Sequence, residues 1–436
     1  MLPITQLKLR LDALLQSNET GYFRLDSEIE GLNLPGWLKA QSVYPKTYWQ
    51  SRESIQQAEY ATLGAIDELN SPQQLISRLR AFRDQNIRPR YIGGHAFDPD
   101  DDSWQEAGSC RFILPALEIC RQGNHYRLSV NCLLTGDNRK SQLQIIESIL
   151  QSLVKELPLA PVSSRYTRLD TPDQQQWRHQ IQTFLKSDLN KVVLSRKSQL
   201  KLEQPINGWD LFDKLCRHSE HSFHYAFEFT PDKMLLSCSP ERLYLRHGDK
   251  LKTEALAGSI GRSGSPQKDQ MLAQQLLDDP KNIRENQYVA DDIEQQLAAI
   301  ADSIKIAPVE ILPLRLIQHL RRPIQASLKP EADDAKLLAK LHPTPAVSGT
   351  PRRQAREFIR RHEPYRRGWY AGVCGFSDGE VAEFAVNIRC ATLSGSELNL
   401  YAGAGIVEGS DPDQEWQELN HKIANLLLML EPEHDS

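Results

Sequence analysis

The sequence has no cysteine framework and no long apolar run. Its seven cysteines are odd in number, are scattered singly, and form no CxxC pair, which excludes a zinc or disulfide framework and indicates reduced thiols. The N-terminal residues alternate charges with leucines and lack the unbroken apolar core of a signal peptide. No stretch is long enough to span a bilayer. We therefore expect a soluble, cytoplasmic protein.

Charge of one sign is not in excess either. The chain has 52 Lys and Arg residues against 57 Asp and Glu residues, a formal net charge of -5 with both signs interspersed. This composition gives no reason to expect nucleic acid or an anionic membrane as a partner. Internal repeats and low-complexity segments are also missing. With 40% apolar residues, the chain can bury a sizeable core.

Helix-like and strand-like stretches are mixed without the regular order of βαβ units. Helices are predicted over residues 1–20, 71–82, 141–157, 175–188, 208–217, 268–301 and 412–430. Strands are predicted over 44–49, 61–66, 91–97, 111–120, 126–134, 191–202, 224–230, 234–239, a hairpin in 241–258, 383–395 and 397–407. This mixture is typical of an α+β layered sandwich. A linker near residue 165 separates 1–164 from 165–436, and we expect the two parts to form one integrated unit.

Residues 401–422, YAGAGIVEGSDPDQEWQELNHK, place a glycine-rich strand end before a helix. The glycine spacing is one residue off the dinucleotide fingerprint, and a single following helix cannot complete a βαβ unit. The Lys-Ser/Thr pair of a phosphate loop is also missing. Two interpretations stay open: the glycines permit a tight turn, or Gly403 and Gly405 let a ligand touch backbone N–H groups directly.

Carboxylates on two predicted helices could share one cation. In the last helix, Glu415, Glu418 and Lys422 fall within an arc of ~60°, which alone would also suit a solvated rim with Glu-to-Lys pairing. The helix predicted over 268–301 presents Glu285 beside an apolar face. Two helices that each offer a carboxylate could hold Mg²⁺, which prefers a few hard oxygens and keeps other positions for water or an anionic substrate.

Two further residues have side chains suited to proton transfer. In the strand that begins KVVLSR, alternation places Lys191 on the same face as Val193 and Ser195. An apolar neighbourhood would either pair this lysine with a carboxylate or favour its neutral form, which can act as a base. Glu241, in CSPERL, follows a proline at a strand end, where a Ser-Pro-Glu sequence is usually only a turn.

Seven motifs follow one another in order along the chain: KVVLSR, SCSPERL, KTEALAGS, DDPKNIRENQYVADDI, LHPTPAVSG, EFAVNIR and the stretch 401–422. In these motifs the chain resembles the chorismate-binding enzyme family. The motifs cover about residues 165–430. The segments VYPKTYWQSRE and IGGHAFDP in the N-terminal part are similar to the menaquinone-pathway isochorismate synthases of that family. The resemblance implies two large, mainly antiparallel sheets around one active-site cleft.

The resemblance also implies roles for individual residues. Glu285 and Glu418 would hold Mg²⁺, with Glu415 assisting through water, and the metal would grip the ring carboxylate of chorismate. Lys191 would be the catalytic base and Glu241 the catalytic acid. The implied substrate-binding residues are Gly258, Ser259, His342, Tyr370, Arg389, Gly403 and Lys422. For His342 and Tyr370, a loop-capping histidine and a packed tyrosine are the plain structural alternatives.

Single residues indicate the nucleophile within the family. Aminodeoxychorismate synthases carry a lysine where this chain has Ala257, and anthranilate synthases lack the lysine found here at position 191. The resemblance therefore implies that water attacks C2 of chorismate and that the product is isochorismate. No glutaminase subunit is expected as a partner.

Three functions are weighed. The first is an isochorismate synthase that binds chorismate and isochorismate, in the menaquinone branch or in siderophore synthesis. The second is a salicylate synthase, which also eliminates pyruvate from isochorismate. The third is a chorismate-binding protein without turnover, against which the intact Lys191, Glu241, Glu285 and Glu418 argue.

Overall fold

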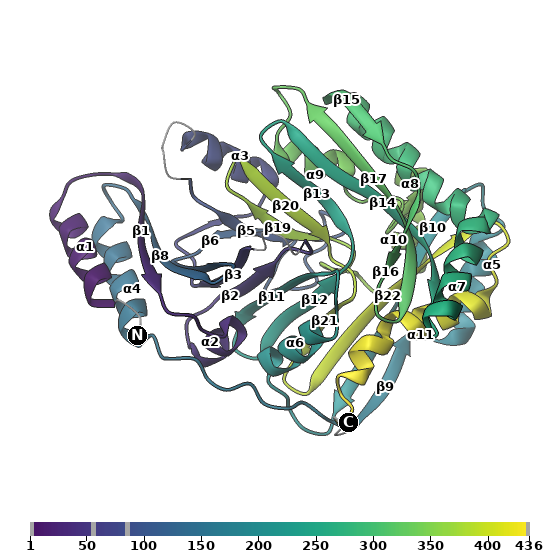
Figure 1. Ribbon diagram of the computed structural model, residues 1–436, viewed down its shortest axis with the longest axis horizontal. Coiled ribbons are helices and arrows are strands. Elements are labelled where there is room, and N and C mark those ends of the chain that lie inside the picture. Colours follow the sequence, from purple (N-terminus) through teal and green to yellow (C-terminus); the bar gives the residue numbers. More distant parts are fainter. Residues whose placement is uncertain (1–3, 54–57, 83–87, 433–436) are drawn as a thin grey trace.

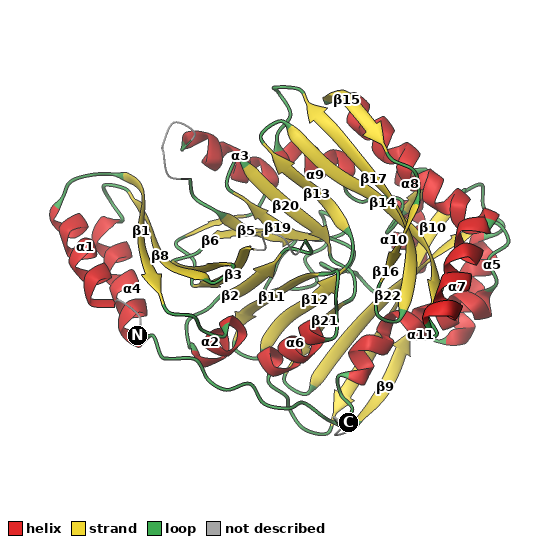
Figure 2. Ribbon diagram, viewed as in Figure 1, coloured by secondary structure: helices red, strands yellow, loops and turns green. Residues whose placement is uncertain are grey.

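The computed structural model describes residues 4–53, 58–82 and 88–432, and its core is formed by two large antiparallel sheets. The predicted α+β fold class is confirmed. Figure 2 shows the strands in two layers with helices outside them. Figure 1 shows α5, α7, α8 and α11 gathered at one end of the molecule and α1 and α4 at the other.

The first sheet has twelve strands. Their order is β1 (Gly21–Ile29), β8 (His125–Leu134), β7 (Leu117–Gln122), β3 (Ala58–Leu63), β2 (Lys46–Gln50), β11 (Phe223–Thr230), β12 (Lys233–Ser239), β21 (Cys390–Ser394), β22 (Glu397–Val407), β10 (Lys191–Leu202) and β18 (Gly349–Thr350), with β9 (Tyr166–Thr171) also paired to β10.

The second sheet has ten strands. Their order is β15 (Ala301–Ile306), β17 (Ile317–Leu328), β14 (Lys250–Gly261), β13 (Arg242–His247), β20 (Val381–Val386), β19 (Val373–Ser377), β5 (Tyr91–His95), β6 (Cys110–Leu114) and β4 (Asp67–Leu69), with β16 (Glu310–Pro313) also paired to β17. Strands from 1–164 and from 165–436 therefore lie in both sheets.

Helices cover the outer faces and the ends of the sheets. They are α1 (Ile4–Gln16), α2 (Leu34–Ala40), α3 (Pro72–Ala81), α4 (Arg139–Ser152), α5 (Gln174–Phe184), α6 (Gly208–Arg217), α7 (Pro266–Asp278), α8 (Pro280–Ala298), α9 (Asp334–Leu341), α10 (Arg352–His362) and α11 (Pro412–Leu428). Helix α8 packs on β14, β15 and β17, whereas α11 packs on β22. None of the helices in the described part of the chain combines the length and apolar character needed to cross a membrane.

Three elements predicted as continuous are broken, two of them at a proline. The helix predicted over 268–301 is two helices, because Pro280 cannot donate a backbone hydrogen bond and leaves Asp279 extended; Asp279 then caps α8 by accepting from the Lys281 N–H. The strand predicted over 111–120 is two strands, β6 and β7, with Pro115 in the gap between them. Within the linker predicted near residue 165, β9 forms an edge strand paired with β10.

The third break carries the chain from one sheet to the other. The strand predicted over 383–395 ends as β20 in the ten-stranded sheet and resumes as β21 in the twelve-stranded sheet. Arg389 lies between them with φ of 53°, a left-handed conformation that is rare for a residue with a side chain. The buried Asn387 fixes the crossing, since its amide donates to the Trp369 carbonyl at 2.8 Å and accepts from the Tyr225 hydroxyl at 3.0 Å. The crossing lies beside the cleft described below.

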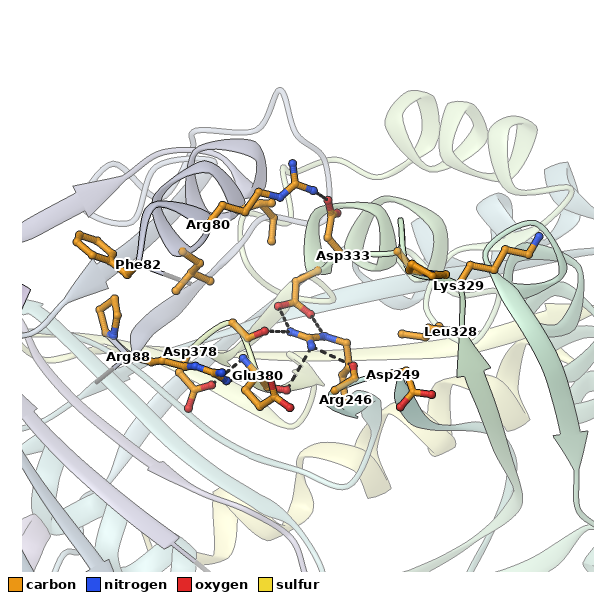
Figure 3. A pocket seen from close by; sticks show the side chains of 18 residues that line it. Arg80, Phe82, Arg88, Arg246, Asp249, Leu328, Lys329, Asp333, Asp378 and Glu380 are labelled. Carbon is orange, nitrogen blue, oxygen red and sulfur yellow. Dashed lines mark hydrogen bonds and ion pairs between the residues drawn. The ribbon is translucent and has the colours of Figure 1, made fainter. Parts of the chain in front are cut away.

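A wide cavity of about 340 Å³ lies between α3, α9 and the turns of the ten-stranded sheet (Figure 3). Three of its arginines are paired with carboxylates. Arg246 binds both carboxylate oxygens of Asp334 at 2.7 Å, Arg88 pairs with Glu380, and Arg80 pairs with Asp333. These pairs hold α3, α9 and the turns of the sheet together around the cavity.

We predict that Asp334→Ala lowers the free energy of unfolding by about 3–5 kcal/mol, because it leaves the guanidinium of Arg246 buried without its counter-ion. Urea unfolding followed by circular dichroism measures the change. Asp249→Ala, at an exposed position of the same cavity, is the matched control and should leave the midpoint unchanged. Equal midpoints for the two variants would contradict this account.

Candidate active site

A narrow cleft between the two sheets is lined by charged, polar and apolar side chains from both layers. It is lined by Val193, Pro240, Glu241, Leu256, Ala257, Gly258, Ser259, Glu285, His319, Ala346, Val347, Tyr370, Ile388, Arg389, Tyr401, Ala402, Gly403, Gly405, Glu418 and Lys422. The ten-stranded sheet contributes β14 and β17, and the twelve-stranded sheet contributes β10 and β22. Most of the predicted site residues therefore meet in one place.

The glycine-rich strand β22 and helix α11 form one wall. Asp411 caps α11 by accepting from the N–H groups of Asp413 and Gln414. The helix presents Glu418 and Lys422, whose charged groups lie 2.6 Å apart. The Lys422 ammonium also donates to the carbonyl of Gly403 at 2.8 Å. The Glu-to-Lys pairing considered for a solvated rim is thus present, but it lies inside the cleft.

Gly405 must lack a side chain because the Glu285 carboxylate occupies the space beside its backbone. A Cβ atom at this position would overlap Oε1 of Glu285 and would lie 3.3 Å from Cε of Lys191. Glycine is therefore the residue that lets helix α8 bring Glu285 against β22. Two interpretations of the glycines were open, a tight turn or close approach of a ligand to the backbone. Gly405 does allow a close approach, but the approaching group is the Glu285 carboxylate of the protein itself.

Lys191 is fully buried and paired with a carboxylate. Its Nζ lies 3.0 Å from Oε1 of Glu285, an ion pair without a well-directed hydrogen bond. This is the first of the two alternatives predicted for an apolar neighbourhood. In the described part of the chain, Glu285 and Gly405 line the cleft and Lys191 does not, although Lys191 lies directly beside both.

Glu241 is a buried carboxyl group that holds its proton at neutral pH. Burial raises its pKa, the negative charge of Glu254 raises it further, and the cations Lys191 and Lys422 oppose both effects only in part, so that the pKa is about 8. A carboxyl group in this state can donate a proton near pH 7. The arrangement at CSPERL is therefore more than a turn.

Glu254 owes its charge to a residue from the N-terminal part of the chain. Burial alone would raise its pKa, but Arg52 and Arg242 outweigh burial and lower it. Arg52 binds both oxygens of Glu254, at 2.6 and 2.8 Å, and also donates to the Pro240 carbonyl. Arg52 thus holds both the neighbouring carboxylate and the loop that carries Glu241.

Arg389 and His319 lie next to each other beside Lys422. Nη1 of Arg389 donates to the Lys422 carbonyl at 3.2 Å, and Nη2 lies 3.3 Å from Nε2 of His319. Burial, together with the charges of Arg389 and Lys422, holds the pKa of His319 well below its usual value, so the neutral ring accepts from Arg389. Burial also lowers the pKa of Arg389 to about 10. Arg389 and Lys422 therefore bring two cations to the cleft, where Lys422 is paired with Glu418.

The remaining predicted residues take different positions. Ser259 donates to Glu418 at 3.3 Å, and Gly258 beside it has φ of 86°, which favours glycine. Tyr370 is buried, lines the cleft and stacks on Tyr401 with ring centroids 5.2 Å apart. Glu415 does not line the cleft in the described part of the chain, and it binds Lys281 at 2.7 Å.

His342 lies behind the cleft. It is the C-cap residue of α9, its Nε2 lies 2.8 Å from the Ala371 carbonyl, and its ring meets His95 edge to face at 4.8 Å. It is not among the lining side chains in the described part of the chain. This placement matches the plain structural alternative of a capping histidine.

Several residues of the site were not predicted. His319, Tyr401, Arg52 and Glu254 come from strands or loops far apart in the sequence. His319 is opposite Ser259 in the β14–β17 pair, and only knowledge of that register could have revealed it. Arg52 lies within the VYPKTYWQSRE segment. The polar residues that follow the strand in this segment were the one signal in the sequence that could have pointed to Arg52.

The donor set fits a small hard cation. Glu285 and Glu418 bring two carboxylates to one cleft from helices on opposite sheets, and the bare backbone at Gly405 keeps space for the first of them. In this structure lysines balance both charges. Carboxylate oxygens with room for water suit Mg²⁺ and offer no soft ligand.

The cleft is small as it stands. Its volume is about 70 Å³, whereas pockets for small molecules usually measure ~300–1,000 Å³. The two lysine–carboxylate pairs and the stacked tyrosines occupy part of the space between the sheets. A ligand of the size of a substituted ring must therefore displace these side chains when it enters.

Comparison with known proteins defines the class. The chain matches the family described as chorismate binding enzyme over residues 9–431. It belongs to the chorismate-binding enzymes, and the predicted membership is confirmed.

Individual relatives are similar over nearly their whole length. The isochorismate synthase MenF of Escherichia coli is 38% identical over 91% of this chain and 90% of its own. The salicylate biosynthesis isochorismate synthase of Pseudomonas aeruginosa is 33% identical over 87% and 83%. The solved structure of the Escherichia coli menaquinone-specific isochorismate synthase has a TM-score of 0.88 at 35% identity, covering 98% of this chain and 100% of that one.

We predict that Glu254→Gln lowers the pKa of Glu241 from about 8, because the negative charge beside the carboxyl group is removed while Lys191 and Lys422 stay. Infrared titration of the protonated carboxyl C=O band follows the ionisation directly. Glu241→Gln should abolish the titrating band and so identify it. A band that titrates at the same pH in Glu254→Gln and in the unchanged protein would contradict the role given to Glu254.

Proposed function

We propose that this protein is an isochorismate synthase, which converts chorismate to isochorismate with Mg²⁺, and that the product enters menaquinone synthesis. The observation that carries the proposal is that two groups suited to proton transfer lie at one cleft. Glu241 lines it and holds a proton at neutral pH, and Lys191 is buried beside Glu285, a carboxylate proposed to bind the metal. The similarity to MenF relatives over almost the whole chain supports the pathway.

Chorismate carries two carboxylates, and the cleft offers cations to match them. Arg389 and Lys422 would neutralise the enolpyruvyl carboxylate, and the backbone near Gly403 would approach it closely. Glu285 and Glu418 would hold Mg²⁺, which when bound supplies positive charge for the ring carboxylate, with Glu415 assisting through water. Ser259 and Gly258 would border the ring, and Tyr370 would pack against it.

The chemistry is the addition of water at C2 with loss of the C4 hydroxyl. Lys191 would take a proton from the attacking water, and Glu241 would give its proton to the departing hydroxyl, which leaves as water. Each positioned proton transfer of this kind is typically worth about 10²–10⁴-fold in rate. Because Glu241 loses its proton as the pH rises through about 8, kcat should fall on the alkaline side.

The ion pair between Lys191 and Glu285 must loosen before catalysis. The Nζ of Lys191 lies 3.0 Å from Oε1 of Glu285, and a nitrogen engaged with this carboxylate is not free to meet the attacking water. Release of Glu285 from this pair would free the Nζ of the buried Lys191 for the proton transfer proposed above.

Ala257 limits the nucleophile to one from solution. Its side chain lines the cleft and carries no amine, so it cannot attack the ring. Water is therefore the proposed nucleophile, and no ammonia-supplying partner is needed.

We expect the full-length protein to convert chorismate with Mg²⁺ to isochorismate in a reversible mixture, with pyruvate near background when followed with lactate dehydrogenase.

Lys191→Ala should abolish turnover while chorismate still binds. Glu241→Gln should lower kcat far more than it raises KM, since the shape is kept and only the proton is lost. Lys197→Ala, on the same strand but outside the cleft lining, is the control that should keep its activity. Substantial turnover by Lys191→Ala would refute the assignment, and stoichiometric pyruvate with salicylate would establish a salicylate synthase.

We also expect Glu285→Gln and Glu418→Gln to need a higher Mg²⁺ concentration for half-maximal activity, by at least about tenfold, because each removes one carboxylate from the cation. Titration of activity against Mg²⁺ measures this directly. Glu294→Gln, on the exposed face of the same helix α8, is the matched control and should keep the original titration curve. If either site variant also keeps it, the metal lies elsewhere.

A further inference from the structure

A cluster of two cysteines and a histidine lies outside the catalytic residues. Cys216 on α6, His224 on β11 and Cys238 on β12 each direct one sulfur or ring nitrogen to a common point, and these atoms all lie within 4.8 Å of one another. None of them has a role in the proposed proton transfers. All three come from elements of the twelve-stranded sheet or its covering helix.

The hydrogen bonds of His224 determine its charge. Its Nδ1 lies 2.7 Å from Oε1 of Gln50, and its Nε2 lies 2.7 Å from the Ser219 carbonyl oxygen. The Gln50 amide nitrogen donates to Glu59 at 3.2 Å, which directs Oε1 toward the histidine. Since both partners are acceptors, both ring nitrogens must donate, and the ring is an imidazolium. Burial alone would lower its pKa, but the Cys238 sulfur and the Ser219 carbonyl outweigh burial and raise it.

The same arrangement favours a thiolate at Cys238. Burial by itself would raise the pKa of this thiol, but a hydrogen bond from the Cys216 thiol and the charge of His224 lower it to about 5. Burial raises the pKa of Cys216, which therefore stays a thiol. A thiolate beside a cation is the nucleophilic form of cysteine. A metal ion would find no free lone pair on this histidine, because both nitrogens already donate.

Cys238 can be reached from a cavity next to the active site. It forms part of the wall of a second hollow, together with Ser219, Arg389 and Lys422. Arg389 and Lys422 also line the catalytic cleft, so the two spaces share a wall. The surroundings of Cys238 are therefore electropositive and accessible to a small solute.

We propose that Cys238 is a modification site, a reactive thiolate that hydroperoxides oxidise and that Cys216 resolves into a disulfide. The Cys238 thiolate attacks the terminal oxygen of the hydroperoxide, the S–O bond forms as the O–O bond breaks, and the leaving alkoxide or hydroxide takes a proton from the His224 imidazolium, which solvent then reprotonates. The sulfenic acid is then attacked by the Cys216 sulfur, the S–S bond forms, and water leaves. Two electrons pass from the two thiols to the peroxide.

Disulfide formation acts on the catalytic acid, a consequence that rests on the proposed function. Cys216 lies on α6 and Cys238 near the end of β12, so joining the sulfurs pulls the helix and the strand toward each other. The Cys238 N–H donates to the Arg389 carbonyl at 3.4 Å, and β12 leads through Pro240 to Glu241. Oxidation therefore displaces two cleft residues and lowers turnover, and reduction restores it.

The first test measures thiol reactivity without reference to turnover. The full-length protein is treated with limiting iodoacetamide at about pH 7, and each cysteine is quantified by peptide mass spectrometry. Cys238 should be alkylated at least about tenfold faster than the buried Cys120 and Cys132, and His224→Gln should remove that advantage because the cation is lost. Alkylation of Cys238 at the rate of the other buried thiols, or an unchanged rate in His224→Gln, would overturn the proposal.

The second test uses hydrogen peroxide and non-reducing peptide mapping. A peptide pair joined through Cys216 and Cys238 should appear, with activity lost in parallel and recovered with dithiothreitol. Cys216→Ser should give no pair and should stop at a sulfenic acid on Cys238, whereas Cys110→Ser, at a partly exposed position elsewhere, should behave as the unchanged protein. Failure of the joined peptide to form overturns the site. If the pair forms in a protein that does not consume chorismate, the proposed function fails and the site stands.

Discussion

The ion pair between Lys191 and Glu285 joins the two layers of the molecule at its centre. Lys191 lies on β10 of the twelve-stranded sheet, and Glu285 lies on α8, which packs on the ten-stranded sheet. Bare backbone at Gly405 is the consequence, because a side chain there would occupy the position of the carboxylate. A second lysine–carboxylate pair, Lys422 with Glu418, lies within α11 one helical turn apart and does not cross between the layers. Both lysine–carboxylate pairs therefore occupy part of the space at the cleft.

Two neighbouring carboxyl groups, Glu241 at the cleft and Glu254 beside it, have pKa values shifted in opposite directions. Burial alone would raise the pKa of Glu254, but Arg52, which binds both its oxygens, and Arg242 lower it. Burial raises the pKa of Glu241 to about 8, and the charge of Glu254 adds to that rise. Arg52 belongs to the N-terminal part of the chain, whereas Glu241 belongs to the part with the family motifs. The N-terminal part, in which fewer family motifs were found, thus helps to set the protonation state of the proposed acid, Glu241. It also contributes strands to both sheets.

The local sequence predicted where helices and strands occur, but it did not predict where a long helix or strand is interrupted. Alternation and helical spacing located β10, β22 and α11, and ordered motifs indicated the family that the comparisons confirm. Breaks at Pro280 and near Arg389 were missed, because long apolar or polar runs continue across them. Among site residues, Glu241, Arg389 and Lys422 reach the cleft as expected, but His342 caps a helix behind it. His319 and Glu254 depend on strand register, which no single segment encodes.

The central claim is that water attacks C2 while Glu241 protonates the C4 hydroxyl as it leaves. Turnover of chorismate in water enriched in the heavy oxygen isotope tests it most directly, with isochorismate analysed by mass spectrometry at early times. The account predicts that each molecule of product carries one heavy oxygen at C2 and that the original C4 oxygen is lost to solvent. Product formed without label, by internal transfer of the substrate hydroxyl, would contradict it.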